Sequence, residues 1–177
     1  MWRILKQVAR TGRLTEAPRV VTLGEPATDN NDRPTAPLIH QDLLHIIGRA
    51  LSIRAVDAGS CNGCELEISA LNNPIYNIEG LGIKFVASPR HADLLLVTGP
   101  VSRHMAEALR RSFDAMPAPK LVVAVGDCGC TGGLFGESYA SCGRVANVIP
   151  VDFTVAGCPP EPIDILRGIL AAVQRSG

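Results

Sequence analysis

The sequence predicts a doubly wound α/β domain, and two features of the chain indicate this fold. Five short segments are apolar and rich in β-branched residues or Leu, and they form continuous runs, as do strands buried on both faces of a parallel sheet. Segments with the apolar spacing of helices lie between them, which is the βαβ order. We therefore expect a mainly parallel sheet with helices on both faces.

The expected elements follow one another along the chain. A helix is expected over residues 41–51, and the strands over 52–56, 83–87, 94–98, 121–125 and 153–156. Three further helices are expected over 64–71, 103–116 and 162–175. Pro159 and Pro160 are expected where the last helix begins, since a proline lacks only an N–H that is unpaired there anyway. That position places Cys158 beside a helix N-terminus, which favours a thiolate.

Residues 1–40 are expected to form an arm and a linker, and residues 41–177 the α/β domain. Apolar residues recur at helical spacing in the first ten residues, among basic ones that include Arg3 and Lys6. Three interpretations remain open for this start: an amphipathic helix on a membrane or partner, a solvated terminus, and a transit peptide. Residues 22–37 are rich in Pro, Asn and Asp and are typical of a linker.

Composition narrows the function classes. The chain has 177 residues, of which 46% are hydrophobic, enough for one buried core. Its 17 basic and 17 acidic residues cancel, which gives no overall field for binding nucleic acid. No run reaches the roughly 18 apolar residues of a membrane span, and Arg and Lys interrupt the first residues, so no secretory signal is expected. In a reducing cytosol, paired cysteines bind metal or do redox chemistry more often than they form structural disulfides.

Four cysteines follow the ends of predicted strands. Cys61 and Cys64 come after the first strand, Cys128 after the fourth and Cys158 after the fifth. The carboxyl ends of parallel strands share one edge of the sheet, so these thiols are expected to converge there. Glycines crowd the same loops and allow backbone N–H groups to approach sulfur: Gly59, Gly63, Gly126, Gly129, Gly132, Gly133 and Gly157.

Several chemistries remain open from the spacing alone. Four thiolates suit an iron–sulfur cluster or a zinc ion, whereas a redox disulfide needs only Cys61 and Cys64. Structural zinc sites usually pair two C-x-x-C motifs in a small module without a core, and this chain has one such pair on a larger domain. Cys130 is an equal candidate to Cys128 on spacing, while Cys142 is interpreted as a small buried hydrophobe.

Four segments then resemble a known family. In order, "SCNGCELEI", "GIKFVASPRHADLLLVTGPV", "VGDCGCTGG" and "VIPVDFTVAGCPPEP" are similar to the small iron–sulfur subunit shared by energy-converting membrane-bound NiFe hydrogenases and respiratory complex I, the NADH-quinone oxidoreductase. The resemblance covers about residues 52–173. It implies a flavodoxin-like domain with one 4Fe-4S cluster, whose ligands carry over as Cys61, Cys64, Cys128 and Cys158. It thereby selects Cys128 over Cys130.

The resemblance also implies partners and a location. We expect an electron-transfer subunit that breaks no substrate bond and is bound to a hydrogenase-type or complex I-type large subunit, a ferredoxin-like iron–sulfur subunit and membrane subunits. Its expected place is the cytoplasmic face of the inner membrane, as a peripheral protein. Complex I subunits typically have adjacent cysteines where this chain has C-x-x-C, which favours a hydrogenase of the formate hydrogenlyase type. A quinone reductase subunit is the alternative, and a structural module that binds zinc through four cysteines is the second alternative.

The remaining polar residues suggest no catalytic group. The four histidines are scattered and form no nucleophile–base arrangement: His40, His45, His91 and His104. Arg90 and His91, in the family-like "SPRHAD" segment, are expected on the cluster-bearing edge, where the guanidinium offsets negative charge. Glu65 is interpreted as a helix N-terminal carboxylate, with assistance to proton movement as the alternative. Asp57 and Asp127 are expected to be turn residues.

Overall fold

The computed structural model describes residues 50–176 and contains a five-stranded sheet in which every pairing is parallel. The strands are β1 (Leu51–Asp57), β2 (Ile83–Phe85), β3 (Leu94–Thr98), β4 (Leu121–Val125) and β5 (Phe153–Val155). Their order across the sheet is β2-β1-β3-β4-β5, which is the flavodoxin-like order. The predicted fold class is confirmed. The expected arm, linker and domain boundary, and the helix over 41–51 up to residue 49, lie outside the described residues, while Leu51 begins β1.

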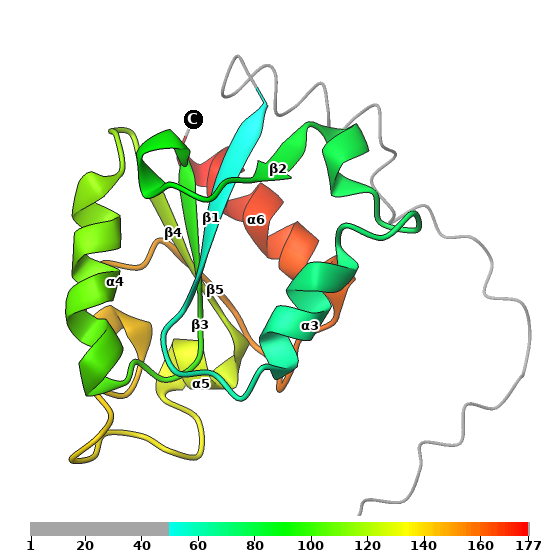
Figure 1. Ribbon diagram of the computed structural model, residues 1–177. Coiled ribbons are helices and arrows are strands. Elements are labelled where there is room, and N and C mark those ends of the chain that lie inside the picture. The colour runs from blue at the N-terminus through cyan, green and yellow to red at the C-terminus, as the bar shows by residue number, and fades with distance from the viewer. Residues whose placement is uncertain (1–49, 177) are drawn as a thin grey trace, which may run out of the picture. The chain divides into compact units, whose positions relative to one another are not determined.

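Helices cover both faces of this sheet (Figure 1). On one face lie α3 (Gly63–Ala70) and α6 (Pro162–Ser176), and on the other lies α4 (Arg103–Ala115). The short helix α5 (Gly126–Thr131) follows β4 directly. Three single turns complete the domain: η1 (Ile78–Leu81), η2 (Pro89–His91) and η3 (Val145–Asn147).

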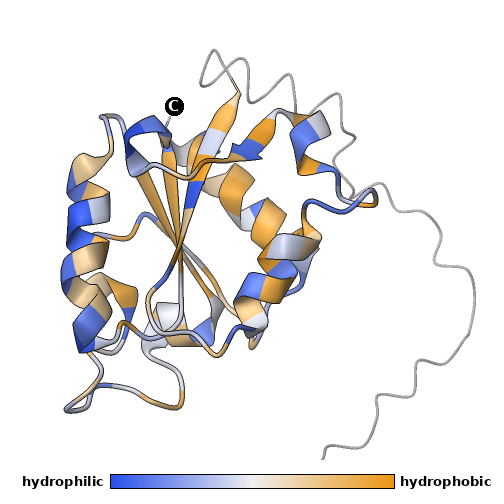
Figure 2. Cartoon of the chain, in the orientation of Figure 1, coloured by the Kyte–Doolittle hydropathy of each residue, from blue (hydrophilic) through white to orange (hydrophobic). Residues whose placement is uncertain are grey.

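The central strand β3 shows why the sheet is buried on both faces. Leu94 and Leu96 pack into the core under α3 and α6, whereas Leu95 and Val97 pack into the core under α4. All four side chains are fully buried. Successive residues of a strand point to opposite faces, so a strand between two helix layers must be apolar throughout. Figure 2 shows the strands as the most apolar elements of the domain.

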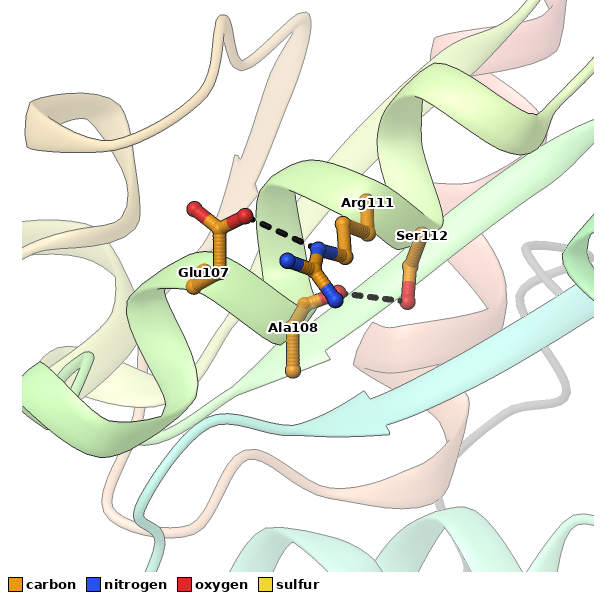
Figure 3. Close-up of polar contacts among 4 residues, drawn as sticks. All are labelled: Glu107, Ala108, Arg111 and Ser112. Carbon is orange, nitrogen blue, oxygen red and sulfur yellow. Dashed lines mark hydrogen bonds and ion pairs between the residues drawn. The ribbon is translucent and has the colours of Figure 1, made fainter.

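The helix α4 shows how a helix on this sheet begins and which face it exposes. Ser102 caps the helix, because its Oγ accepts a hydrogen bond from the Met105 N–H at 3.3 Å. Arg111 and Glu107, one helical turn apart on the solvent side of α4, form an ion pair in which Nε and Oε1 are 2.8 Å apart (Figure 3). Both side chains are mostly exposed, so this pair contributes little to stability.

Several boundaries differ from the sequence-based expectation. β2 ends at Phe85, although Val86 and Ala87 continue its apolar run. Residues 126–131, expected as a loop, form α5. The last helix begins at Pro162, as its expected range has it, but Pro159 and Pro160 precede it, so Cys158 lies four residues before the helix. The strands β3 and β4 agree with the expectation at both ends.

Among residues 50–176, no helix is both long enough and apolar enough to cross a bilayer.

Candidate metal centre

The four predicted ligands lie at the carboxyl edge of the sheet. Cys61 is in the loop after β1 and Cys64 is in the first turn of α3. Cys128 lies in α5, directly after β4, and Cys158 lies in the loop between β5 and α6. The start of α3 and the whole of α5 meet at one edge of the sheet in Figure 1. The predicted convergence of the three strand ends is therefore observed.

Two glycines leave room for the sulfurs at this edge. A Cβ atom on Gly126 would lie 2.6 Å from Cys64 Sγ, and one on Gly133 would lie 2.7 Å from Cys128 Sγ. Both glycines also have a positive φ, of 82° and 54°, which L side chains rarely adopt. The absence of side chains at these two positions keeps the space next to two of the four thiols free.

The pKa values of Cys64 and Cys128 are raised in part by the other candidate ligands. Burial raises the pKa of Cys64 to about 12, with further contributions from the Glu65 carboxylate and then from Cys61, Cys128 and Cys158. The pKa of Cys128 is also raised, first by burial, then by Cys158, Cys61 and Asp127. Thiolates are the form that binds metal, and each one makes the next harder to form in this group. A positively charged metal group removes that repulsion, so the donor set fits one.

Cys130 lies outside this group. Its sulfur is within hydrogen-bonding distance of the Val155 carbonyl oxygen (3.4 Å) and the Ala124 carbonyl oxygen (3.6 Å). Burial raises its pKa to about 11, with Asp127 adding to the effect and the hydrogen bond to Val155 opposing it. None of the four candidate ligands contributes to that pKa. Residues two apart in a helix point about 200° away from each other, so α5 directs Cys128 and Cys130 to different surroundings.

The predicted turn residues Asp57 and Asp127 hold the cysteine loops. Asp57 Oδ1 accepts hydrogen bonds from the N–H groups of Gly59 (2.8 Å) and Ser60 (2.7 Å) just before Cys61. Asp127 Oδ1 accepts a hydrogen bond from the Gly157 N–H at 2.7 Å and so joins the β4 loop to the β5 loop. The expectation for Asp57 is confirmed, whereas Asp127 lies in the helix α5, and its contact with the loop that carries Cys158 is new.

Glu65 occupies the first turn of α3, as expected of a helix N-terminal carboxylate. Its Oε2 accepts a hydrogen bond from Ser60 Oγ at 2.7 Å. Its Oε1 is buried and has no hydrogen-bond partner in the part of the chain that the structure describes. The unpartnered oxygen lies on the residue next to Cys64, at the cysteine edge.

No three His, Cys, Asp or Glu side chains of residues 50–176 approach closely enough to hold one metal ion together. Cys142 packs at the edge of the core under α4, in agreement with its interpretation as a small hydrophobe. Of the histidines, His91 and His104 are exposed, whereas His40 and His45 lie outside the described residues.

A comparison of this sequence with known protein families identifies the family of the chain. The family described as "NADH ubiquinone oxidoreductase, 20 Kd subunit" matches residues 61–172, which is more than half of the chain. The chain belongs to this family. The four candidate cysteines all lie within the matched residues, so the predicted resemblance is confirmed at the level of the family.

Relatives in this 20 kDa family come from several oxidoreductase complexes. The chain is 42% identical over 148 residues to "Probable membrane-bound hydrogenase subunit mbhJ" of Pyrococcus furiosus, covering 84% of this chain and 89% of that protein. It is 44% identical to "Formate hydrogenlyase subunit 7" of Escherichia coli, covering 74% of this chain and 51% of that protein. It is 45% identical to an NADH-quinone oxidoreductase subunit of Desulfovibrio desulfuricans, covering 70% of this chain and 66% of that protein.

A solved structure matches the fold of this family member. A chain in the structure of the membrane-bound sulfane sulfur reductase (MBS), an archaeal respiratory membrane complex, superimposes with a TM-score of 0.63 at 30% identity. The match covers 76% of this chain and 75% of that chain. The relatives are thus named as subunits of membrane-bound hydrogenase and NADH-quinone oxidoreductase complexes, and the matching structure is of a respiratory membrane complex.

One expectation for this family member is wrong. Arg90 and His91 were expected on the cysteine edge because they follow a strand. β2 pairs only with the first three residues of β1 and ends at the level of Ile53. The segment after it forms η2 and enters β3 at Leu94, which also pairs with Ile53. Arg90 and His91 therefore lie toward the amino edge, away from the cysteines, and do not offset charge there.

Sequence reasoning also missed exposed apolar side chains beside the cysteines. Leu66 of α3 is exposed, and so are three residues in the loop after α5, namely Leu134, Phe135 and Tyr139. Leu134 retains 95% of its accessible surface. Exposed large apolar residues are typical of a surface that another protein covers. The "GLFGESY" segment contains this signal, since two of its large apolar residues stand between glycines, with no helical or strand periodicity to bury them.

Proposed function

We propose that this chain is an electron-transfer subunit that holds one 4Fe-4S cluster through Cys61, Cys64, Cys128 and Cys158. The cluster supplies a one-electron redox centre. The chain would relay electrons between an iron–sulfur partner and the NiFe large subunit of a membrane-bound hydrogenase complex. The catalysis would take place in the partner, and the chain's own cysteines would bind the cluster.

The grouping of the four thiols at one sheet edge is the observation that carries this proposal. They come from three separate segments of the chain, they contribute to the raised pKa values of Cys64 and Cys128, and none of them contributes to the pKa of Cys130. Glycines next to two of the sulfurs leave space for an inorganic group. Membership of the 20 kDa family supports an iron–sulfur group at this place.

A cluster is proposed over a zinc ion, the second alternative, because the chain has a single C-x-x-C pair on a domain with its own core. Zinc needs four ligand atoms at about 2.0–2.3 Å from a single point. Within residues 50–176 no three candidate side chains meet at such a point. In a 4Fe-4S cluster each thiolate binds a different iron, so the sulfurs stay further apart while still belonging to one group.

The partner is proposed to be a hydrogenase, with a quinone reductase as the second candidate. The C-x-x-C spacing of Cys61 and Cys64 favours the hydrogenase branch. The identities do not separate the branches, since hydrogenase relatives at 42% and 44% stand beside a quinone oxidoreductase relative at 45%. A large subunit with C-x-x-C motifs near both of its ends could hold nickel and iron. Such a subunit would identify the partner as a hydrogenase.

The test is purification of the whole complex through a tag on this chain, under anaerobic conditions. We expect nickel in the complex and hydrogen-dependent reduction of a viologen dye. NADH-dependent quinone reduction in a complex without nickel would decide for the second candidate. A Cys61→Ser complex should lose the transfer of electrons to its iron–sulfur donor or acceptor, while hydrogen–deuterium exchange at the nickel centre persists.

The proposed partners fit the surface at the cysteine edge. The exposed apolar residues of α3 and of the loop after α5 would be covered by the large subunit, which brings the cluster close to its metal site. A ferredoxin-like subunit would supply or accept the electrons. The proposed location is the cytoplasmic face of the cell membrane, where membrane subunits of the complex hold this chain as a peripheral protein.

A further inference from the structure

A basic cavity lies on the opposite edge of the domain, away from the cysteines. Its volume is about 310 Å³, at the small end of the range of about 300–1,000 Å³ typical of ligand sites. The residues that line it come from β1, β2, η2 and the turn before β4: Ser52, Lys84, Val86, Arg90, His91 and Pro117. Three of the six carry basic side chains and none carries a carboxylate.

The parallel register explains why these side chains meet. Ser52 of β1 is paired with Lys84 of β2, so both side chains point to the same face of the sheet. That face is the one which carries α4, because neighbouring Leu51 and Ile53 point to the other core. The turn η2 then returns the chain to the start of β3 and brings Arg90 and His91 to the same place.

The basic side chains of the cavity have no partners of opposite charge in the described residues. No ion pair or side-chain hydrogen bond is formed by Lys84, Arg90 or His91 within residues 50–176. By contrast, Arg111 on α4 is paired with Glu107 (Figure 3). The carboxylate closest in sequence, Asp93, directs Oδ2 to the Ser52 N–H at 3.0 Å. Because no carboxylate lines the cavity itself, its grouped cations are an attractive site for a negatively charged ligand.

Ser52 adds an observation that is independent of charge. It is a polar residue that is 7% exposed, yet it lines the cavity. Its backbone N–H is bonded to Asp93, whereas its hydroxyl forms no hydrogen bond with residues 50–176. Because Ser52 lines the cavity, this hydroxyl is available to a group inside it.

We propose that this cavity binds a phosphate group. A guanidinium, an ammonium, an imidazole and a hydroxyl supply donors in several directions, which suits the three or more acceptor oxygens of a phosphate better than the two of a carboxylate. Arg90 can bind two of these oxygens at once, and Lys84 adds a point charge. The phosphate belongs either to a soluble compound or to a phospholipid headgroup, and the experiment distinguishes these sources.

The test uses the full chain and two probes at fixed pH and salt. Pyrophosphate binding is measured by calorimetry, and co-sedimentation is measured with vesicles of phosphatidylglycerol and of phosphatidylcholine. The double variant Lys84→Gln/Arg90→Gln is compared with the double variant Arg111→Gln/Arg167→Gln. The control also removes two positive charges, but from exposed ion pairs outside the cavity. Ser52→Ala removes only the hydroxyl, so it separates a built site from general electrostatic attraction.

We expect Lys84→Gln/Arg90→Gln to weaken binding at least tenfold and the control pair to change it less than twofold. Ser52→Ala should weaken it about three- to tenfold, as expected for one hydrogen bond. Tight pyrophosphate binding identifies a soluble ligand, and binding of phosphatidylglycerol vesicles alone identifies a headgroup. The proposal is overturned if both probes bind the wild type and Lys84→Gln/Arg90→Gln equally, or if the control pair weakens binding as much.

Discussion

Asp127 and Gly157 exchange two hydrogen bonds in opposite directions. The Asp127 N–H donates to the Gly157 carbonyl oxygen at 2.8 Å, and the Gly157 N–H donates to Asp127 Oδ1 at 2.7 Å. Each residue stands next to a candidate ligand, Cys128 in one case and Cys158 in the other. The pair thus sets the separation of two ligands that are 30 positions apart in the chain.

Replacing Asp127 should therefore loosen the cluster site. Asp127→Ala removes a hydrogen bond to a carboxylate, which typically contributes about 1.5 to 3 kcal/mol. We expect cluster loss to a chelator to become roughly tenfold faster, as measured by the decay of the cluster's visible absorbance. Asp127→Asn keeps an acceptor oxygen and is the matched control. Equal rates for Asp127→Ala and the wild type would show that this contact does not hold the site.

The two cysteines of α5 should differ in their need for the cluster. Cys128→Ser should abolish the cluster, because it removes one of four thiolates. Cys130→Ser should keep it, since Cys130 lies against the carbonyl oxygens of Ala124 and Val155 and a hydroxyl can occupy the same place. Iron content after anaerobic purification is the measurement. The reverse result would show that Cys130 is the ligand.

Glycine substitutions test the space around the sulfurs. Gly126→Ala and Gly133→Ala each place a Cβ within 2.7 Å of a cysteine sulfur and also strain a residue with positive φ. Gly136 has a similar φ of 52° and nothing within 4 Å of an added Cβ, so Gly136→Ala shares only the backbone strain of about 1–2 kcal/mol.

We expect the first two variants to lose most of their iron and Gly136→Ala to retain it, at comparable losses of thermal stability. If all three keep equal amounts of iron, the room beside the sulfurs is not needed for the bound group.

The raised thiol pKa values predict an order of alkylation in the cluster-free, folded protein. With a pKa of about 12, only about one Cys64 thiol in ten thousand is ionised at pH 8, and the thiolate is the reactive form. The exposed Cys61 and Cys158 should react with iodoacetamide first, and the more buried Cys64 and Cys130 last. A raised pKa means that the reactive fraction grows with pH, so Cys64 labelling should accelerate about tenfold per pH step between pH 8 and 11.

Mass spectrometry of peptides from timed samples measures this order, and unfolding the protein in urea should make the cysteines react alike. Fast labelling of Cys64 in the folded protein at pH 8 would contradict the burial of its sulfur.

The strand ends and the cysteine edge were predictable because they depend on local pattern and on a general property of parallel sheets. β3 and β4 are continuous apolar runs flanked by polar residues or glycine, so their ends are marked in the sequence. The convergence of Cys61, Cys128 and Cys158 follows from the common edge of parallel strands.

Other features depend on pairing, which the pattern of a single segment does not contain. The apolar run of β2 continues past Phe85, but its pairing with β1 stops there, and this early end moved Arg90 to the other edge. Residues 126–131 contain two glycines and two cysteines, a composition with low helix propensity, so α5 was missed. Recognition of α5 would have separated Cys128 from Cys130 on helical geometry alone.

The central claim is the 4Fe-4S cluster, and the most direct measurement is the iron and acid-labile sulfide content of anaerobically purified protein, together with its EPR spectrum after reduction. We expect about four iron and four sulfide per chain and a reducible EPR signal, all lost in Cys128→Ser and retained in Cys130→Ser. Protein that contains zinc and no sulfide would contradict it.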